Sequence, residues 1–281
     1  MGWVITEDVG RFLAEAGGFL RAGPAENTIL LSVTANVQAG AGTALLFGWW
    51  RDGPQVAGVF ADNPPYPLVL SGMPLQAARA LAIDLAGIGR AVTGVSAYPP
   101  EAAAFAAGWR EATGHGSRLT RQMRLHRLAE LIPPAPPAGQ PRAAGPGDRG
   151  LLLEWQIAFR REVHEPPDPR PHEVDDRLGY GGFTLWEAGG RAVSMAGVSR
   201  AVAGMVRVGP VYTPPEHRGL GYAGAVTAAV SRAALDAGAR NVVLFTDLGN
   251  PTSNALYRRI GYQPLSDRSV LSFVPPGPGP A

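Results

Sequence analysis

The second half of the chain alternates between two hydrophobic periods, which predict a regular succession of helices and strands. Apolar residues recur at helical spacing in some segments, and β-branched residues crowd into short runs in others. In chain order we predict helices over 148–164 and 173–178, strands over 183–187, 191–200 and 206–213, a helix ending at Gly238, a strand over 241–246, a helix over 251–260 and a strand over 269–274. This mixture indicates an α/β (α+β) fold, in which helices flank a mixed sheet.

The first half shows similar patterns. We expect a helix over 6–20 with Thr6 as its N-cap, because apolar residues share one face of that segment. The pair Asp52-Gly53 signals a hairpin turn between two strands. The remaining expectations are strands over 28–37, 44–50, 55–61 and 68–70, a helix from Pro74 to about 86, a strand over 91–97, a helix over 100–112 and a strand over 117–128.

A segment rich in Pro, Gly and Ala separates the halves. Residues 133–147 have the composition of an extended linker, and residues 275–281 that of a flexible tail. We therefore expect a first domain over 1–132 and a second over 148–274.

Composition excludes several classes of site. The 281 residues carry a net charge of +2 and include no Cys, and every basic residue is Arg. Disulfides, cysteinyl metal sites, a Cys nucleophile and a lysine Schiff base are excluded, and we expect no metal. Near-neutral charge argues against a nucleic-acid partner, and no apolar run is long enough to span a bilayer. No secretory signal is evident, so we expect a cytoplasmic protein with no membrane partner.

The stretch after the strand over 206–213 has the clearest chemical pattern. Pro214-Pro215 ends the strand, Arg218-Gly219-Leu220-Gly221 follows, and a helix then begins. Glycines allow close backbone approach, and a helix N-terminus offers unpaired N–H groups and a partial positive charge. This combination predicts an anion site suited to a phosphate or pyrophosphate.

The run Arg218-x-x-Gly221-x-Ala223 resembles the pyrophosphate loop of the GNAT N-acetyltransferases. The resemblance covers roughly residues 148–274 and implies that acetyl-CoA binds as co-substrate. The residues that it assigns to acetyl-CoA are Val211, Tyr212, Thr213, Arg218, Gly219, Leu220, Gly221, Tyr222, Ala223, Asn250 and Asn254.

A second cluster follows the strand over 241–246. Asn250 suits an N-cap, Pro251 the first helical position and Gly261 the helix end, all for local reasons. Asn254 and Tyr257 share a helix face. The pattern Asn-x-x-x-Asn-x-x-Tyr followed by Gly-Tyr resembles the last conserved segment of GNAT enzymes, which implies that Tyr257 is the general acid protonating the thiolate of coenzyme A.

The two halves share an order of elements, which resembles a tandem GNAT protein with two GNAT-like domains. The first copy is degenerate, because Met73–Ala78 stand where the phosphate loop would lie and include neither Gly nor Arg. We expect no coenzyme A in the first half. The first domain could instead complete the sheet, form a wall of the acceptor cleft or mediate a homodimer.

The resemblance implies direct acetyl transfer from acetyl-CoA to a small-molecule or peptide amine, with an N–H near Val211 stabilising the oxyanion. Two alternatives stay open, a non-catalytic acyl-CoA-binding sensor and a tandem acyltransferase similar to mycothiol synthase. The general base is not identified, and Glu187, Glu216, His217 and Asp247 are candidates by sequence proximity. The residues that choose the acceptor are expected within 155–182, where Glu173, Asp175 and Asp176 would suit a cationic amine.

Overall fold

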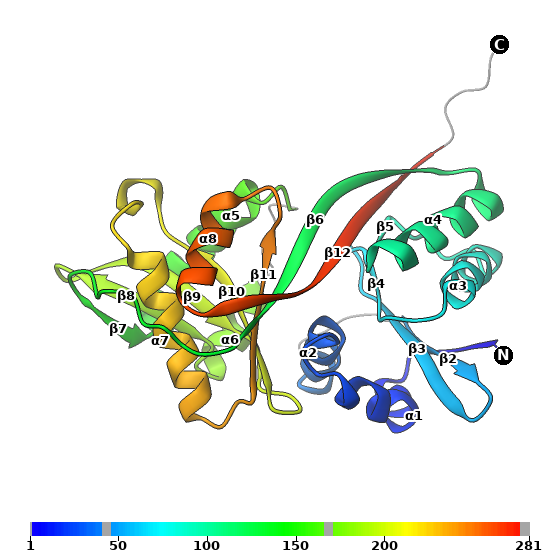
Figure 1. Cartoon of the computed structure of the whole chain (residues 1–281), viewed down its shortest axis with the longest axis horizontal. Coiled ribbons are helices and arrows are strands. Elements are labelled where there is room, and N and C mark those ends of the chain that lie inside the picture. The colour runs from blue at the N-terminus through cyan, green and yellow to red at the C-terminus, as the bar shows by residue number, and fades with distance from the viewer. Residues whose placement is uncertain (1, 41–45, 166–170, 276–281) are drawn as a thin grey trace, which may run out of the picture. The chain divides into compact units, whose positions relative to one another are not determined.

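The computed structural model describes residues 2–40, 46–165 and 171–275, and the chain divides into two compact units (Figure 1). Unit 1 comprises Met1–Leu125, Thr246–Gly249 and Leu265–Ala281, and unit 2 comprises His126–Phe245 and Asn250–Pro264. The start of the strand expected over 44–50 and most of the tail expected over 275–281 lie outside the described residues.

Unit 1 contains a sheet covered by helices. The first half of the chain forms β1 (Gly2–Thr6), α1 (Val9–Ala22), α2 (Thr28–Gln38), β2 (Leu46–Asp52), β3 (Gln55–Asp62), β4 (Leu68–Leu70), α3 (Leu75–Gly87), β5 (Gly94–Ala97), α4 (Pro99–Thr113) and β6 (Gly116–Leu128). Strands β1 to β4 pair antiparallel in succession, and β4 pairs parallel with β5. Buried residues of the strands and of α3 and α4 form one hydrophobic cluster, which includes Phe60, Leu81 and Phe105.

The strand predicted over 28–37 is wrong, because these residues form α2. The β-branched run Thr28-Ile29 and Val33-Thr34 favours a strand locally, but Leu30, Leu31 and Thr34 form a buried helical face. The hydroxyl of Thr34 donates to the carbonyl of Leu30, so its polar group is satisfied inside the helix. Tertiary burial here overrides a weak local propensity.

The start of the first predicted helix also differs. Residues 2–6 form β1, which pairs antiparallel with β2, and α1 begins at Val9. Asp8 is the N-cap instead of Thr6, because its Oδ1 accepts from the amides of Gly10 and Arg11.

Unit 2 carries the elements that the second half predicts. They are β7 (Gln140–Ala143), η1 (Pro146–Asp148), α5 (Arg149–Glu162), α6 (Pro171–Gly179), β8 (Phe183–Ala188), β9 (Arg191–Val198), β10 (Met205–Tyr212), η2 (Pro215–His217), α7 (Tyr222–Asp236), β11 (Asn241–Asp247), α8 (Pro251–Arg259) and β12 (Tyr262–Val274). The order from α5 to β12 is the predicted one. Strand β7 lies within the segment 133–147 and pairs with β8 at the edge of the sheet. Pro141 has no N–H to donate to a neighbouring strand, and it is tolerated here because an edge strand pairs on one side alone.

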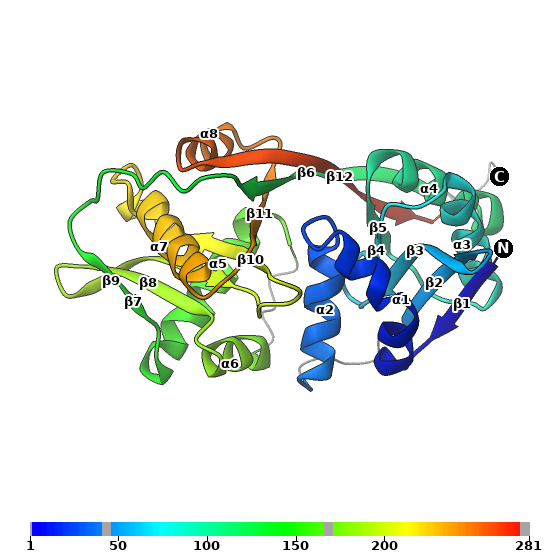
Figure 2. The same cartoon turned by 60° about the horizontal axis from the view of Figure 1, so that its bottom comes forward.

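The strands of unit 2 follow the spatial order β7, β8, β9, β10, β11. All neighbours are antiparallel except β10 and β11, which are parallel. Helix α7 lies across β8, β9 and β10 (Figures 1 and 2). Val206 and Val208 of β10 pack with α7 and α8, whereas Tyr212 packs with Trp155 of α5 and Val174 of α6. The sheet therefore has an α7/α8 face and an α5/α6 face.

The two halves repeat one order of elements, which extends the helix–strand–helix order that the sequence predicts for both. A strand, two helices, three strands, a helix, a strand, a helix and a strand occur in β1–β6 and again in β7–β12, with the two short 3₁₀ turns added in the second. The fourth and fifth strands of each copy, β4–β5 and β10–β11, are the parallel pair. Strands β6 and β12 contribute residues to both units, and residues 269–272 of β12 pair with β5 of unit 1.

Candidate functional site

The start of α7 has free backbone donors. Gly221 is its N-cap with φ +86° and offers no side-chain cap, and Gly219 has φ +78°. The first helical hydrogen bond runs from the amide of Ala225 to the carbonyl of Gly221, so the amides of residues 221–224 have no acceptor within the part of the chain that the structure describes. Free amides at a helix N-terminus suit an anion. This is the arrangement that the glycine pattern predicts.

Residues 133–139 approach this helix start. A Cβ at Gly221 would lie 4.0 Å from Pro137, and one at Gly224 would lie 3.8 Å from Pro134. Gly219 is open, because a Cβ there would meet nothing within 4 Å, and Leu220 is 56% exposed. The proline-rich segment thus lines one side of the loop and leaves its outer side accessible.

Arg218 lies at this loop, and its guanidinium is engaged. Its Nε donates to the carbonyl of Thr213 at 2.9 Å, and its Nη2 lies 2.5 Å from Oε1 of Glu162. Both members of the ion pair are nearly half exposed, so solvent screens the pair strongly. A phosphate at the loop would compete with Glu162 for this arginine.

Strands β10 and β11 part beside the loop. Their parallel pairing runs from Met205 to Val208 of β10, although β10 continues to Tyr212. On the other side, the register of β10 with β9 shifts between Val208 and Val211. The residues after Val208 therefore leave β11 while they stay on β9, which opens the sheet near Val211, where the resemblance expects the oxyanion.

The end of β10 is held by polar contacts. The hydroxyls of Ser194 and Thr213 lie 2.8 Å apart, and the Ser194 hydroxyl also contacts the carbonyl of Tyr212. Val211 packs toward the α7/α8 face and Tyr212 toward the α5/α6 face. Burial raises the pKa of the Tyr212 phenol, which therefore stays neutral.

Helix α8 begins as the sequence predicts. Oδ1 of Asn250 accepts from the amide of Ser253 at 3.0 Å, and Nδ2 of Asn254 donates to the carbonyl of Asn250 at 2.8 Å. Both amide side chains thus serve the first turn of the helix. Their assignment to acetyl-CoA rests on the resemblance alone.

Tyr257 lies on the buried face of α8. It is 8% exposed and packs edge-on against Tyr262 at 6.1 Å between ring centroids. Burial raises the pKa of the Tyr257 phenol to about 12, and among the described residues its hydroxyl makes no hydrogen bond. The hydroxyl of Tyr262, by contrast, lies 2.7 Å from Oγ of Ser231.

The structure brings Tyr257 and α7 together. Tyr257 shares one hydrophobic cluster with Val226 and Val230 of α7, and a Cβ at Gly224 would lie 3.0 Å from Cδ1 of Leu256. The phenol-bearing turn of α8 therefore packs beside the first turn of α7. The two motifs, far apart in sequence, become neighbours on one face of the sheet.

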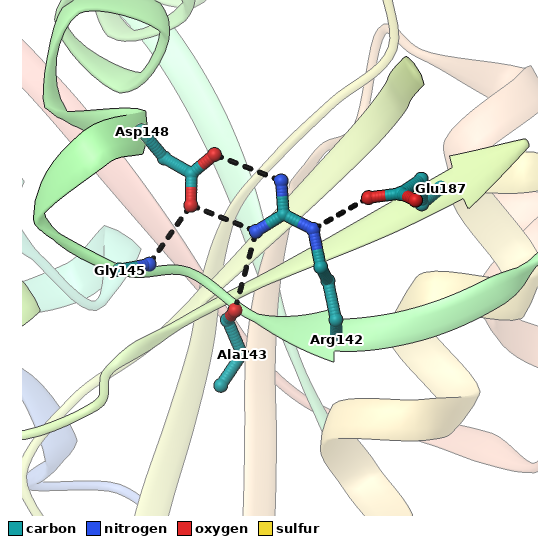
Figure 3. A network of polar contacts seen from close by, with 5 residues as sticks. All are labelled: Arg142, Ala143, Gly145, Asp148 and Glu187. Atoms are coloured by element: carbon teal, nitrogen blue, oxygen red, sulfur yellow. Dashed lines mark hydrogen bonds and ion pairs between the residues drawn. The ribbon is translucent and has the colours of Figure 1, made fainter. Parts of the chain in front are cut away.

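Glu187 is not a free general base. Its carboxylate accepts from Nε of Arg142 at 2.7 Å, and the same guanidinium holds Asp148 through two bonds of 2.7 and 2.8 Å (Figure 3). Asp148 also accepts from the amide of Gly145, so the network ties β7 to β8 and to the start of α5. This structural role was not evident from the sequence, because Arg142 falls within the segment of linker composition.

The other base candidates lie near the carboxyl ends of β10 and β11. Glu216 and His217 belong to η2, and the ring of His217 lies edge-on to Tyr222 at 6.5 Å between ring centroids. Oδ1 of Asp247 accepts from the amide of Gly249 and caps the turn after β11. None of these contacts singles out a base.

The acidic residues of α6 are each paired with an arginine. Glu173 contacts Arg160, Asp175 contacts Arg149, and Asp176 contacts Arg200. Their charge is therefore compensated, which removes the reason to expect them to attract a cationic amine.

The described residues include no group of three or more side chains placed to hold a metal ion. Among the described residues, no helix combines the length and apolar character that a membrane crossing needs.

Comparisons with known proteins identify a family match in the second half of the chain. Residues 151–262 match the model of the acetyltransferase (GNAT) family. A comparison with curated proteins gives no match.

Several solved structures have a similar fold. A GCN5-related N-acetyltransferase from Sphaerobacter thermophilus is 20% identical, with a TM-score of 0.63 over 99% of this chain and 96% of that one. A tandem GNAT protein from the clavulanic acid biosynthesis pathway is 17% identical, with a TM-score of 0.60 over 99% and 100%. A GNAT-family acetyltransferase from Colwellia psychrerythraea is 12% identical, with a TM-score of 0.57 over 97% and 99%.

The expected fold class is thus confirmed over nearly the whole chain, whereas the assigned site residues and domain boundaries stay predictions. Residues 151–262 form a domain of the GNAT acetyltransferase family, in a chain that has the tandem GNAT fold.

Proposed function

We propose that this protein is an N-acetyltransferase that moves an acetyl group from acetyl-CoA to an amine by direct transfer. The GNAT fold supports acyl transfer in general. The observation that carries the finer proposal is the placement of Tyr257 beside the first turn of α7, whose amides are free. One coenzyme molecule could then have its diphosphate at the loop and its sulfur near the phenol.

The loop supplies the recognition of the diphosphate. The free amides of residues 221–224 and the helix dipole favour a dianionic group, and Gly219 and Gly221 let it approach the backbone. Arg218 is within the same loop and would exchange its exposed contact with Glu162 for a phosphate.

The opening between β10 and β11 supplies the place for the reaction. There the acceptor nitrogen attacks the thioester carbonyl, the C–N bond forms and the C–S bond breaks. An N–H near Val211 stabilises the oxyanion. Tyr257 gives its proton to the departing thiolate, and a raised phenol pKa keeps that proton in place at neutral pH. The amine's proton leaves to solvent or to a base that we do not assign.

Two measurements test this proposal. Isothermal titration should detect acetyl-CoA binding, and a screen of amino acids, polyamines, aminoglycosides and peptide N-termini should release free thiol from acetyl-CoA with at least one acceptor. No binding of acetyl-CoA overturns the proposal. Binding without thiol release for any acceptor favours a non-catalytic acyl-CoA sensor.

A further inference from the structure

A group of three arginines lies on the α5/α6 face, where β10 leaves β11. Arg177 is on α6, Arg200 follows β9 and Arg207 is on β10. Arg207 lies between Val206 and Val208, which face α7, so it projects to the opposite face. Nη1 of Arg177 donates to the carbonyl of Gly209, the residue directly after the last β10–β11 pair.

The charges of this group are not balanced. Arg200 pairs with Asp176 and stacks on Tyr180 with 4.3 Å to the ring centroid. Within the described residues, Arg177 and Arg207 have no carboxylate partner, so three guanidiniums share one carboxylate.

Two polar atoms of the group are buried without a partner. Nη1 of Arg207 and Nε of Arg200 are removed from solvent and make no hydrogen bond among the described residues. Burial and the neighbouring Arg177 lower the pKa of Arg207 to about 10, so it remains charged at neutral pH. A buried charged donor without an acceptor lowers the stability of the folded protein, and such donors are rare in native structures. Their presence here therefore suggests that a ligand supplies the acceptor.

The side chains around this charge are held in place. The guanidinium of Arg177 stacks on Phe183 at 5.1 Å, and a Cβ at Gly197 would lie 2.8 Å from its Nη1. The Tyr180 hydroxyl donates to the carbonyl of Val198. The three arginines are therefore held in place by their neighbours. The two N–H groups that have no acceptor, on Arg207 and Arg200, have fixed positions.

We propose that Arg177 and Arg207 bind the carboxylate of the acceptor amine, so that the acceptor is an amino acid or a similar small amino carboxylate. This inference rests on the proposed function, since it places the acceptor at the opening opposite Tyr257. Two guanidiniums match a carboxylate by several charge-assisted hydrogen bonds. The acceptor's nitrogen then enters the opening while its carboxylate stays on the α5/α6 face.

The first test compares matched acceptors. Each standard L-amino acid and its C-terminal amide are assayed with acetyl-CoA by free thiol release, together with ethanolamine and O-phosphoethanolamine. We expect kcat/KM for the best amino acid to exceed that of its amide by roughly 10²-fold. Equal or better use of amides overturns the inference, and so does preference for O-phosphoethanolamine, since that shows a phosphate site.

Arg207→Gln should bring the ratio of acid to amide activity close to one, mainly through a higher KM for the acid. Arg232→Gln, which removes an exposed arginine of α7, is the matched control and should keep the ratio. An unchanged ratio in Arg207→Gln contradicts the assignment.

The second test needs no turnover. Millimolar amino acids, but not their amides, should raise the Tm of the wild-type protein, and Arg207→Gln should abolish this shift. Absence of the shift overturns the inference. Acetyl-CoA titration is run separately, so that failure of the proposed function is recognised independently of the carboxylate result.

Stability separates a binding role from a structural one. Replacing a buried, unpaired charge by an apolar side chain is neutral or stabilising, so Arg207→Met should keep or raise Tm in the absence of ligand. A loss of several degrees would show that Arg207 supports the fold and would contradict the proposal.

Discussion

At the scale of single residues, Tyr257 and Tyr262 show how similar surroundings leave two phenols with different uses. Both are buried in one cluster, and their rings touch edge to face. The hydroxyl of Tyr262 is hydrogen-bonded to Ser231, whereas the hydroxyl of Tyr257 has no hydrogen-bond partner among the described residues. A phenol reserved in this way is available to a substrate.

Tyr257→Phe is expected to lower kcat by roughly 10²-fold while acetyl-CoA binding and Tm stay nearly unchanged, because only the proton donor is lost. Since the phenol pKa is about 12 and the acid must be protonated, the wild-type rate should show no descending limb from this group below about pH 11. Thiol-release kinetics across pH measure both effects.

The control is Tyr262→Phe, which removes a satisfied buried hydroxyl. It should lower stability by about 1 kcal/mol and leave kcat within a few fold. A descending limb near pH 9 that disappears in Tyr257→Phe would contradict the raised pKa.

Asp148 provides a prediction for stability. The bonds from Arg142 and from the Gly145 amide hold the pKa of Asp148 below its usual value. A depressed folded pKa means that this stabilisation is present above the unfolded pKa and is lost as pH falls through the folded one. Asp148→Asn should therefore cost about 1–2 kcal/mol at neutral pH.

The difference between wild type and Asp148→Asn should shrink steadily as pH drops below about 4. Denaturant unfolding at a series of pH values measures it. A difference that stays constant into that range would show that the ion pair contributes nothing to folding.

At the scale of elements, the start of α7 combines backbone features that no single residue supplies. Two glycines with positive φ turn the chain, and the helix then begins without a side-chain cap. Its donors are left free because an N-terminal amide has no partner inside its own helix. Strand β10 precedes α7 in the chain and β11 follows it, so the proposed coenzyme loop and the proposed place of reaction are built from consecutive elements.

Gly221→Ala is expected to cost roughly 1 kcal/mol of stability and to weaken acetyl-CoA binding at least tenfold, because Gly221 has φ +86° at the mouth of the loop. Gly189→Ala is the matched control, with φ +58° in the turn between β8 and β9. It should show a similar stability loss and an unchanged acetyl-CoA Kd by isothermal titration. Equal Kd values for both variants would remove the loop from the binding site.

At the scale of the whole molecule, one order of elements occurs twice, but the two copies differ where a helix begins. Helix α3 of the first copy has Pro74 at its N-cap position and no glycine loop before it. The amide of Met73 already donates to the carboxylate of Glu101, at 3.4 Å. A carboxylate at a helix start repels a phosphate there, so we expect the first copy to bind no coenzyme.

Titration of the full chain with acetyl-CoA is therefore expected to show a single binding site. Gly221→Ala should lower the affinity of all the binding that the titration detects. The molar ratio and the heat per injection measure this directly. A second class of sites that persists in Gly221→Ala would show that the first copy binds the coenzyme after all.

Sequence patterns by themselves determined the order of elements from α5 to β12, the glycine loop, the caps of α8 and the helix–strand–helix order that both halves share. These follow from local rules, since periodicity, proline, glycine and N-cap residues act within one turn or one strand. The helix α2 departs from its local preference because burial of Leu30 and Leu31 decides it.

Only the tertiary structure decided which side chains meet. It paired Glu187 with Arg142, occupied Arg218 with Glu162, and gathered Arg177, Arg200 and Arg207 from separate elements. Such groupings depend on strand register and on which face of the sheet each residue takes, and contacts between distant segments leave no signal in the local pattern.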